Sequence, residues 1–220
     1  MLATILPENK KVKALMFEKI IPDIVVSRLP IYLQTLQRFE NEGKTTTSSQ
    51  ELGERSCINA AQVRKDLSFF GEFGKQGSGY NITYLSDQIR SILKINRVWD
   101  VALVGVGDLG HAIARNPGFT ERGFRIVFVF DNDPAKINPK IGKHTILPTE
   151  TMVETIKNAD ISVALITVPS RAAQAVADQL VQAGIKAILN YAQASLNVPD
   201  HIRVETVSPI LQLQHMMYYL

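Results

Sequence analysis

Cysteine is almost absent from this chain of 220 residues, which carries Cys57 alone. One cysteine cannot form an intrachain disulfide, so a disulfide-stapled secreted fold is excluded and a reducing, cytoplasmic setting is expected. Apolar runs as long as the roughly 20 residues of a membrane helix are also missing. Lys10, Lys11 and Lys13 interrupt the segment where a signal peptide would be apolar, so we expect no membrane association.

Catalytic signatures are missing too. No histidines, cysteines or acids have the spacing of a metal site, and there is no nucleophile elbow. The four histidines stand outside any recognisable acid/base constellation. A hydrophobic content of 45% nevertheless predicts a packed core. The net charge is only +3, and basic residues outnumber acids only in residues 1–99, by 14 to 10. The N-terminal half is therefore the part expected to face a polyanion.

A glycine-rich turn organises the second half of the chain. Residues 101–104 predict a buried strand, and Gly105, Gly107 and Gly110 follow in the spacing G-x-G-x-x-G before a predicted helix. In a dinucleotide-binding turn these glycines make the bend, admit a pyrophosphate and allow close packing of helix on strand, in that order. The helix N-terminus adds N–H groups for the phosphates. The turn residues predicted to bind the cofactor are Gly105, Val106, Gly107, Asp108, Leu109 and Gly110.

An acidic residue stands where a ribose-binding carboxylate is expected. The apolar run 126–130 ends at Asp131, which lies 24 residues after Gly107, and the typical spacing is about 20. A carboxylate here favours NAD(H), because it would repel a 2′-phosphate. A βαβ unit with a tight turn and no nucleotide is the alternative interpretation.

From residue 100 onward, strand-like and helix-like segments alternate, which predicts an α/β unit with a Rossmann-like parallel sheet. The ligand of such a sheet lies beyond the carboxyl ends of its strands. Because no acid/base group accompanies these strand ends, sensing is favoured over catalysis. Besides the glycine turn, the residues predicted to line the pocket are Asp131, Asn132, Thr167, Val168, Pro169, Asn190 and Tyr191.

Two short predicted helices before residue 70 have the pattern of a helix-turn-helix. Ser48 or Ser49 caps the first, over residues 50–55, and Asn59 caps the second. The glycine-rich residues 71–79 then predict a hairpin, which makes the unit a winged helix-turn-helix. A helical docking module is the alternative. The residues predicted to contact DNA are Ser48, Ser49, Gln62, Arg64, Lys65, Ser68, Lys75, Gly77 and Tyr80.

Two further helices are predicted. One runs from about Leu29 to Glu40, with Pro30 in its first turn. The other, residues 209–220, is too apolar to lie in water, and we favour burial against a second subunit. These elements predict an N-terminal segment with a winged helix over residues 1–98, a Rossmann domain over 99–206 and a dimerisation helix over 207–220.

Several blocks of the sequence together resemble the redox-sensing transcriptional repressor Rex family. The similarity covers nearly the whole chain after Pro22, and the block QVRKDLSFFGEFGK is its most specific part. The blocks that carry it are residues 27–32, 62–75, 77–81, 105–110, 117–119, 130–134 and 188–192.

The resemblance implies a homodimer whose winged helices bind a palindromic operator and whose Rossmann domains bind NADH or NAD+. It implies that the C-terminal helix is swapped onto the partner and that NADH releases the DNA. By the same resemblance, Arg64, Lys65 and Lys75 contact DNA, and Asn190 and Tyr191 match a pair near the nicotinamide.

Two positions depart from the family pattern. Asn116 replaces a tyrosine before the Pro-Gly-Phe turn, and Ser208 replaces an aspartate at the start of the C-terminal helix. With the arginine that corresponds to Arg28, those residues form the family's polar switch, so Arg28 is expected to lack its carboxylate partner. We therefore expect DNA and dinucleotide binding to persist, with a redox response that is weakened or uses other contacts.

Two other functions stay open from the sequence. An NAD-dependent oxidoreductase with an N-terminal accessory module would have to transfer hydride, and the missing acid/base group argues against it. A DNA-binding protein whose Rossmann domain is only a dimerisation scaffold would not bind NADH tightly.

Overall fold

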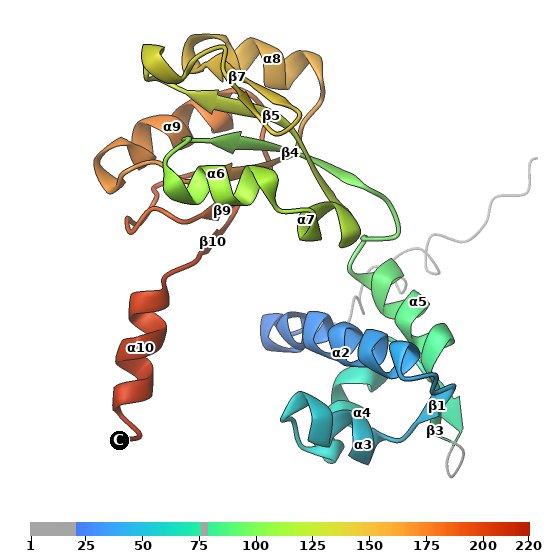
Figure 1. Ribbon diagram of the computed structural model, residues 1–220. Coiled ribbons are helices and arrows are strands. Elements are labelled where there is room, and N and C mark those ends of the chain that lie inside the picture. The colour runs from blue at the N-terminus through green and yellow to red at the C-terminus, as the bar shows by residue number, and fades with distance from the viewer. Residues whose placement is uncertain (1–20, 76–78) are drawn as a thin grey trace, which may run out of the picture. The chain divides into compact units, whose positions relative to one another are not determined.

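The computed structural model describes residues 21–75 and 79–220. The chain separates into two compact units, residues 1–96 and 97–220, whose elements are labelled in Figure 1. Each unit has its own apolar core.

The first unit combines helices with a small antiparallel sheet. Its described helices are α2 (Asp23–Asn41), α3 (Ser49–Ser56), α4 (Ala60–Ser68) and α5 (Ile82–Ile92). Its strands are β1 (Thr46–Thr47), β2 (Gly74–Lys75) and β3 (Gly79–Asn81), in the order β1-β3-β2. Two short helices followed by a hairpin make this unit the predicted winged helix-turn-helix.

Short polar side chains fix where the helices begin. Ser48 Oγ accepts the N–H of Glu51 at 3.0 Å, so of the two predicted caps Ser48 and Ser49 the first is the cap, and Asn59 Oδ1 accepts the N–H of Ala61 at 2.7 Å, as predicted. The predicted start of α2 at Leu29 is wrong by six residues. The Pro22 carbonyl accepts the N–H of Val25, whose side chain is buried, so the first turn forms earlier and Pro30 lies inside the helix.

The second unit is a doubly covered, mostly parallel sheet in the order β10-β9-β8-β4-β5-β7-β6. Its strands are β4 (Trp99–Val104), β5 (Phe124–Asp131), β6 (Lys140–Ile141), β7 (His144–Pro148), β8 (Val163–Ile166), β9 (Ala187–Asn190) and β10 (Arg203–Thr206). Only the edge pair β6 and β7 is antiparallel. The helices are α6 (Asp108–Arg115), α7 (Gly118–Glu121), α8 (Met152–Asn158) and α9 (Ser170–Gln182), with 3-10 turns at Pro134–Lys136 and Thr149–Thr151.

Alternate residues of β4 enter two different cores. Ala102 and Val104 pack with residues of α8 and α9, whereas Val101 and Leu103 pack with Ile113 of α6. Helices therefore cover both faces of the sheet (Figure 1). This explains why β4 is a continuous apolar run rather than an alternating one.

Three features of this unit differ from the sequence prediction. Helix α7 and the β6–β7 hairpin were not expected, because their segments are short and rich in polar residues. Strand β8 is shorter than the predicted run 159–168, since Asp160 has a φ of +50° and turns the chain before Val163.

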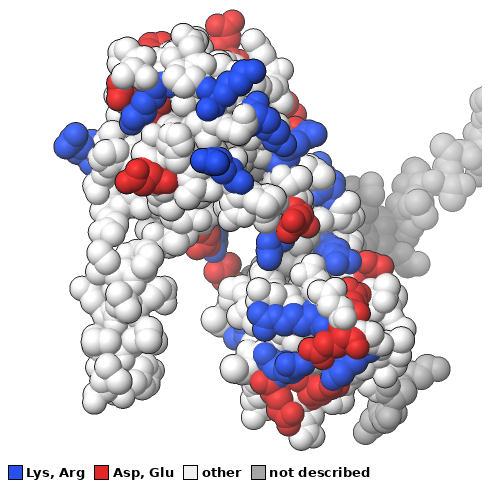
Figure 2. All heavy atoms as spheres, viewed as in Figure 1, with Lys and Arg blue, Asp and Glu red and all other residues white. Residues whose placement is uncertain are grey.

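The last helix, α10 (Pro209–Met217), is exposed along its whole length. Leu211, Leu213 and Met216 are each more than half exposed. The helix has no charged side chain and is white in Figure 2. An apolar surface of this extent is typical of an interface. No helix within the described ranges is both long and apolar enough to cross a membrane.

Candidate functional site

The glycine turn lies where the order of strands reverses. From β4 the chain goes outward to β5 and β7 on one side, and then returns to add β8, β9 and β10 on the other. The ends of β4 and β8 are paired, with Val104 opposite Ile166. A crevice outside the carboxyl ends of such strands is where open α/β sheets bind ligands.

Tight packing across this switch point requires two of the glycines. Gly105 has a φ of +99°, and a Cβ there would lie 2.8 Å from Val168 Cγ1 and 2.9 Å from the Thr167 carbonyl. The Thr167 hydroxyl donates to the Gly105 carbonyl at 2.7 Å. A Cβ on Gly110 would overlap that same carbonyl oxygen. The structure thus brings the predicted residues Gly105, Gly110, Thr167 and Val168 together.

Gly107 is different, because a Cβ built on it meets no atom within 4 Å. Its φ of −82° is also open to any residue. The fold therefore does not require glycine here, and the bare backbone precedes the N-terminus of α6. An open backbone approach of this kind is what a pyrophosphate group needs.

Asp131 holds the same turn from the end of β5. The side chain is 6% exposed, and its two carboxylate oxygens accept the N–H of Val106 at 2.6 Å and the N–H of Asp133 at 2.9 Å. Lys136 Nζ lies 3.6 Å from one of these oxygens. Asn132, next to it, is exposed. Asp131 therefore has a structural role in the turn, and its oxygens keep lone pairs for a further donor such as a ribose hydroxyl.

The end of β9 is shaped by Asn190. Its side chain is fully buried, donating to the Ala194 carbonyl at 2.8 Å and accepting the N–H of Ala192 at 3.0 Å. These bonds fold the loop that presents Tyr191, a half-buried side chain whose phenol pKa is raised by burial. Pro169 precedes the first turn of α9 at the end of the neighbouring strand.

In the first unit, the predicted DNA-contacting residues on α3 and α4 are linked. Arg64 Nη1 donates to Ser49 Oγ at 2.8 Å, and both residues are outside the core. Lys65 is exposed, and Ser68 Oγ donates to its carbonyl at 2.7 Å. Ser48 is occupied as the cap of α3. An exposed helix with two cations at the helix-turn-helix position is suited to the backbone and base edges of DNA.

The wing is described only in part. Tyr80 pairs across the sheet with Thr47 and Gly74 and packs on the core of the unit, and burial raises its pKa. Gly77 and the side chain of Lys75 lie outside the described residues.

Asp66 of α4 is the centre of a buried polar network. It is fully buried, and Oδ2 accepts from Arg28 Nε at 2.5 Å and from the Tyr32 hydroxyl at 2.7 Å. Oδ1 accepts from Arg28 Nη2 at 2.6 Å and from Gln62 Nε2 at 2.5 Å. Burial alone would raise the pKa of this carboxyl, but the bonds from Arg28, Tyr32 and Gln62 outweigh it and hold the pKa below its usual range.

Arg28 therefore has a carboxylate partner, although not at position 208, where the family pattern places one and this chain has a serine. Its partner, Asp66, comes from its own unit in a bidentate pair. A sequence signal was present, because Asp66 stands on the apolar face of α4 between Val63 and Leu67. A carboxylate in a buried helical face requires a partner.

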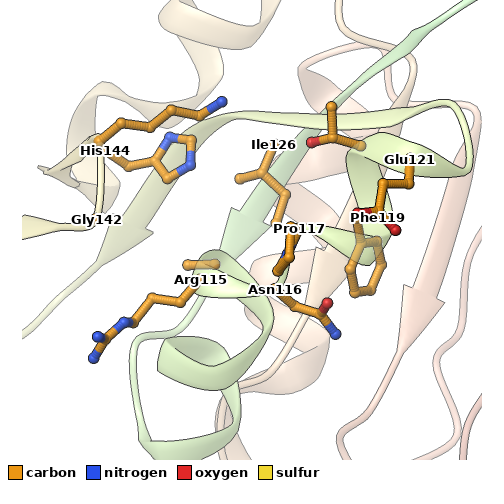
Figure 3. Close-up of a pocket in the computed structure, with 11 residues that line it drawn as sticks. Arg115, Asn116, Pro117, Phe119, Glu121, Ile126, Gly142 and His144 are labelled. Carbon is orange, nitrogen blue, oxygen red and sulfur yellow. The ribbon is translucent and has the colours of Figure 1, made fainter.

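The other two predicted switch residues serve local structure in the second unit. Asn116 Oδ1 accepts the N–H of Gly118 at 2.9 Å, which positions the start of α7. Asn116 lines a cavity of about 520 Å³ together with Phe119, Ile126 and His144, whose side chains are labelled in Figure 3. Ser208 caps α10, where Oγ accepts the N–H of Leu211 at 3.4 Å. Both sites are built without the tyrosine or the carboxylate that the resemblance led us to expect there.

A winged-helix unit and a Rossmann unit with a glycine turn at the switch point define the class of protein: a DNA-binding regulator with a dinucleotide-type domain. The family model described as "Putative DNA-binding protein N-terminus" matches residues 20–68, and the one described as "CoA binding domain" matches residues 96–194.

The chain belongs to the family of redox-sensing transcriptional repressors named Rex. It is 51% identical to the Rex of Chloroflexus aurantiacus, over 90% of this chain and 94% of that one, and 49% identical to the Rex of a Roseiflexus species, over 90% of each. A crystal structure of RSP in complex with β-NAD+ and operator DNA superposes with a TM-score of 0.86 at 35% identity, covering 92% of this chain and 93% of that one. RSP with β-NADH gives a TM-score of 0.83 at 32% identity, covering 92% and 95%. These relatives are repressors rather than enzymes, which decides against the oxidoreductase hypothesis.

Proposed function

We propose that this protein is a dimeric transcriptional repressor that binds a palindromic operator through its winged helix and is released from it by NADH. The observation that carries the proposal is the pairing, in one chain, of an exposed recognition helix with a glycine turn at the switch point of a parallel sheet. Membership of the Rex family supports it.

On the DNA side, Lys65 and Arg64 of α4 contact base edges or phosphates in the major groove, together with Gln62 and Ser68. Ser48 and Ser49 at the start of α3 bind the phosphate backbone, and the wing with Lys75, Gly77 and Tyr80 follows the adjacent groove. The exposed position of the α4 cations supports this assignment.

On the cofactor side, the glycine turn binds the pyrophosphate of NAD(H), and Asp131 and Asn132 meet the adenosine ribose. The nicotinamide end lies toward Thr167, Val168, Pro169, Asn190 and Tyr191, which the order of the strands brings to one edge of the sheet. Lys136 lies near Asp131, but the N–H groups of Val106 and Asp133 fix the position of the Asp131 carboxylate in the turn. A carboxylate held there would repel a 2′-phosphate, so the site favours NAD(H).

The functional domains span residues 1–98, 99–206 and 207–220. Helix α10 packs on the second subunit of a homodimer. The exposed, uncharged surface of α10 supports this assembly. A bacterial repressor acts where its operator is, so we place its action in the cytoplasm.

A repressor with a weakened redox sensor is the second candidate. Asn116 and Ser208 make local hydrogen bonds, and neither carries a negative charge. Arg28 is meanwhile occupied by Asp66 within the first unit. The polar switch of the family therefore has no carboxylate at position 208 to draw on in this chain.

The test is fluorescence anisotropy with a duplex that the protein itself selects from a random-sequence pool. NADH and then NAD+ are titrated at fixed salt, because salt alone changes DNA affinity steeply. Release by NADH but not by NAD+ is expected for the redox-sensing repressor. A Lys65→Ala variant should bind the duplex more weakly while it retains NADH binding. Selective DNA binding that ignores both nucleotides would support the weakened sensor, and the absence of selective binding would refute the proposed function.

A further inference from the structure

The orientation of the Gln62 side-chain amide is fixed by chemistry. The oxygen and nitrogen of such an amide are usually assigned from their hydrogen-bond partners. Here the partner at 2.5 Å is Oδ1 of Asp66, and an ionised carboxylate can only accept. The nitrogen of Gln62 must therefore face Asp66, and its carbonyl oxygen Oε1 must point the other way.

Asp66 cannot give way easily, because it is fully buried and its two oxygens accept four hydrogen bonds. Arg28 supplies two of these bonds, Tyr32 one and Gln62 one. Rotation of the Gln62 amide would place two oxygens against each other. A side chain locked by such a network keeps one geometry with little loss of entropy on binding.

Gln62 also lies at the part of α4 that a helix-turn-helix presents to base edges. It is the third residue of the helix, which starts at Ala60, and it is partly exposed. Residues near the N-terminus of a recognition helix are those that contact bases. Within the described ranges no group donates to Gln62 Oε1. Its neighbour Arg64 is tied to Ser49 instead.

The groups that remain free define the base that Gln62 can read. One bond to Asp66 uses one of the two N–H groups, which leaves Oε1 as an acceptor and the second N–H as a donor. Adenine presents the matching pair in the major groove, the N6 amine and the N7 acceptor. Cytosine offers only an amine, while guanine and thymine offer no amine there.

We propose that Asp66 is a positioning residue and that Gln62, held by it, reads one adenine in each operator half-site through N6 and N7. This assignment rests on the proposed function, since it requires an operator. It adds the chemical identity of one base and the reason that one side chain can select it.

The test replaces each adenine of the selected duplex, one at a time, by purine, which lacks the N6 amine, or by 7-deazaadenine, which lacks N7. Wild-type protein should lose about five- to fiftyfold in affinity at one position per half-site. Gln62→Met should lose affinity for the unmodified duplex and become indifferent to both analogues at that position. Gln50→Met on α3 is the matched control. Gln50 is an exposed glutamine bonded to Glu54, and its variant should respond to the analogues like wild type.

Asp66→Asn separates positioning from a merely structural effect. Asparagine can both donate and accept, so it no longer dictates the orientation of the Gln62 amide. We expect discrimination between adenine and its analogues to fall severalfold, while affinity for a random duplex and its salt slope stay unchanged. If Asp66→Asn unfolds the unit, the affinities for the selected duplex and for the random duplex will fall together. In that case the assignment is decided by comparing wild type and Gln62→Met on the unmodified and the analogue-containing duplexes.

Three results would overturn the inference. Gln62 reads no adenine if replacing each adenine by an analogue leaves the affinity unchanged. The same follows if Gln62→Met leaves the effects of the analogues intact. If Gln62→Met changes the response only to loss of a cytosine amine, the base that Gln62 reads is cytosine and not adenine. A wild-type protein that selects no duplex would instead refute the proposed function, on which the inference depends.

Discussion

The three glycines of the turn after β4 meet different surroundings at the residue scale. The first and third lie against other backbone atoms, whereas Gly107 faces open space. A substitution can therefore separate what the fold needs from what the nucleotide needs.

Gly107→Ala should fold like wild type, with a free energy of unfolding changed by less than about 1 kcal/mol. Its NADH affinity should fall at least tenfold, because the methyl group occupies the approach of the pyrophosphate. Gly110→Ala should destabilise the unit by about 1–3 kcal/mol, since the new Cβ overlaps the Gly105 carbonyl. Urea unfolding followed by the single tryptophan, Trp99, and calorimetric titration of NADH measure the two effects. Equal NADH binding by Gly107→Ala and wild type would contradict the proposed site.

Asp66 gives the first unit a defined response to acid. Its pKa is lowered in the folded state, so the carboxylate stabilises the fold at pH values above its unfolded pKa of about 3.9. That contribution is lost as the pH falls through the folded pKa. Asp66→Asn should lower stability on the order of 3 kcal/mol at pH 7, because the guanidinium of Arg28 loses its partner.

The measurement is urea unfolding by far-UV circular dichroism between pH 7 and pH 3. Wild-type stability should decrease below about pH 4, and the difference from Asp66→Asn should shrink there. Trp99 lies in the other unit, and its fluorescence transition serves as the internal control. A difference between the proteins that is the same at pH 7 and pH 3 would show that the carboxylate charge is not responsible.

At the scale of elements, the helices and strands that the sequence predicts best are those with a long and regular apolar pattern. The buried strand β4 and the helix starts at Ser48 and Asn59 could be predicted, because strand burial and helix caps leave local signals. The β6–β7 hairpin could not, since what holds it is the pairing of β7 with β5 and the packing of Ile141 and Ile146 in the core, and the short local sequence shows neither. The position of Asp66 on an apolar helix face signals that it needs a partner, but Arg28 is 38 residues away, and no local pattern identifies it as that partner.

Helix α10 carries a prediction of its own, because its apolar side chains are exposed and uncharged. Leu213→Asp should shift the protein from dimer toward monomer, since a carboxylate would be desolvated in the interface. Gln214→Asp introduces the same charge one residue away, on a polar position of the helix, and should perturb the dimer less. Sedimentation velocity at micromolar concentration compares the three proteins. A monomeric wild type, or equal effects of the two variants, would show that this apolar surface does not hold the dimer.

At the scale of the whole molecule, the question is how a nucleotide in one unit changes DNA binding by the other. A ligand can shift an equilibrium only by its difference in affinity for the two states. A change from 1:99 to 99:1 requires a preference of about 10⁴, or roughly 5.5 kcal/mol. Charged, desolvated hydrogen bonds are the interactions strong enough to supply a large share of this energy. The chain has an arginine at position 28, but Asn116 and Ser208 stand where the sequence resemblance led us to expect a tyrosine and an aspartate.

Ser208→Asp restores the missing charge without disturbing the helix start, because aspartate is as good a cap as serine. We expect the ratio of operator affinities in NAD+ and in NADH to increase about fivefold or more. Ser208→Asn is the matched control, since asparagine also caps a helix but has no charge, and its ratio should stay at the wild-type value. An unchanged ratio in Ser208→Asp would mean that Arg28 does not exchange Asp66 for a carboxylate at position 208. The wild-type response would then have to arise from other contacts, and Arg28 would serve only to hold the recognition helix through Asp66.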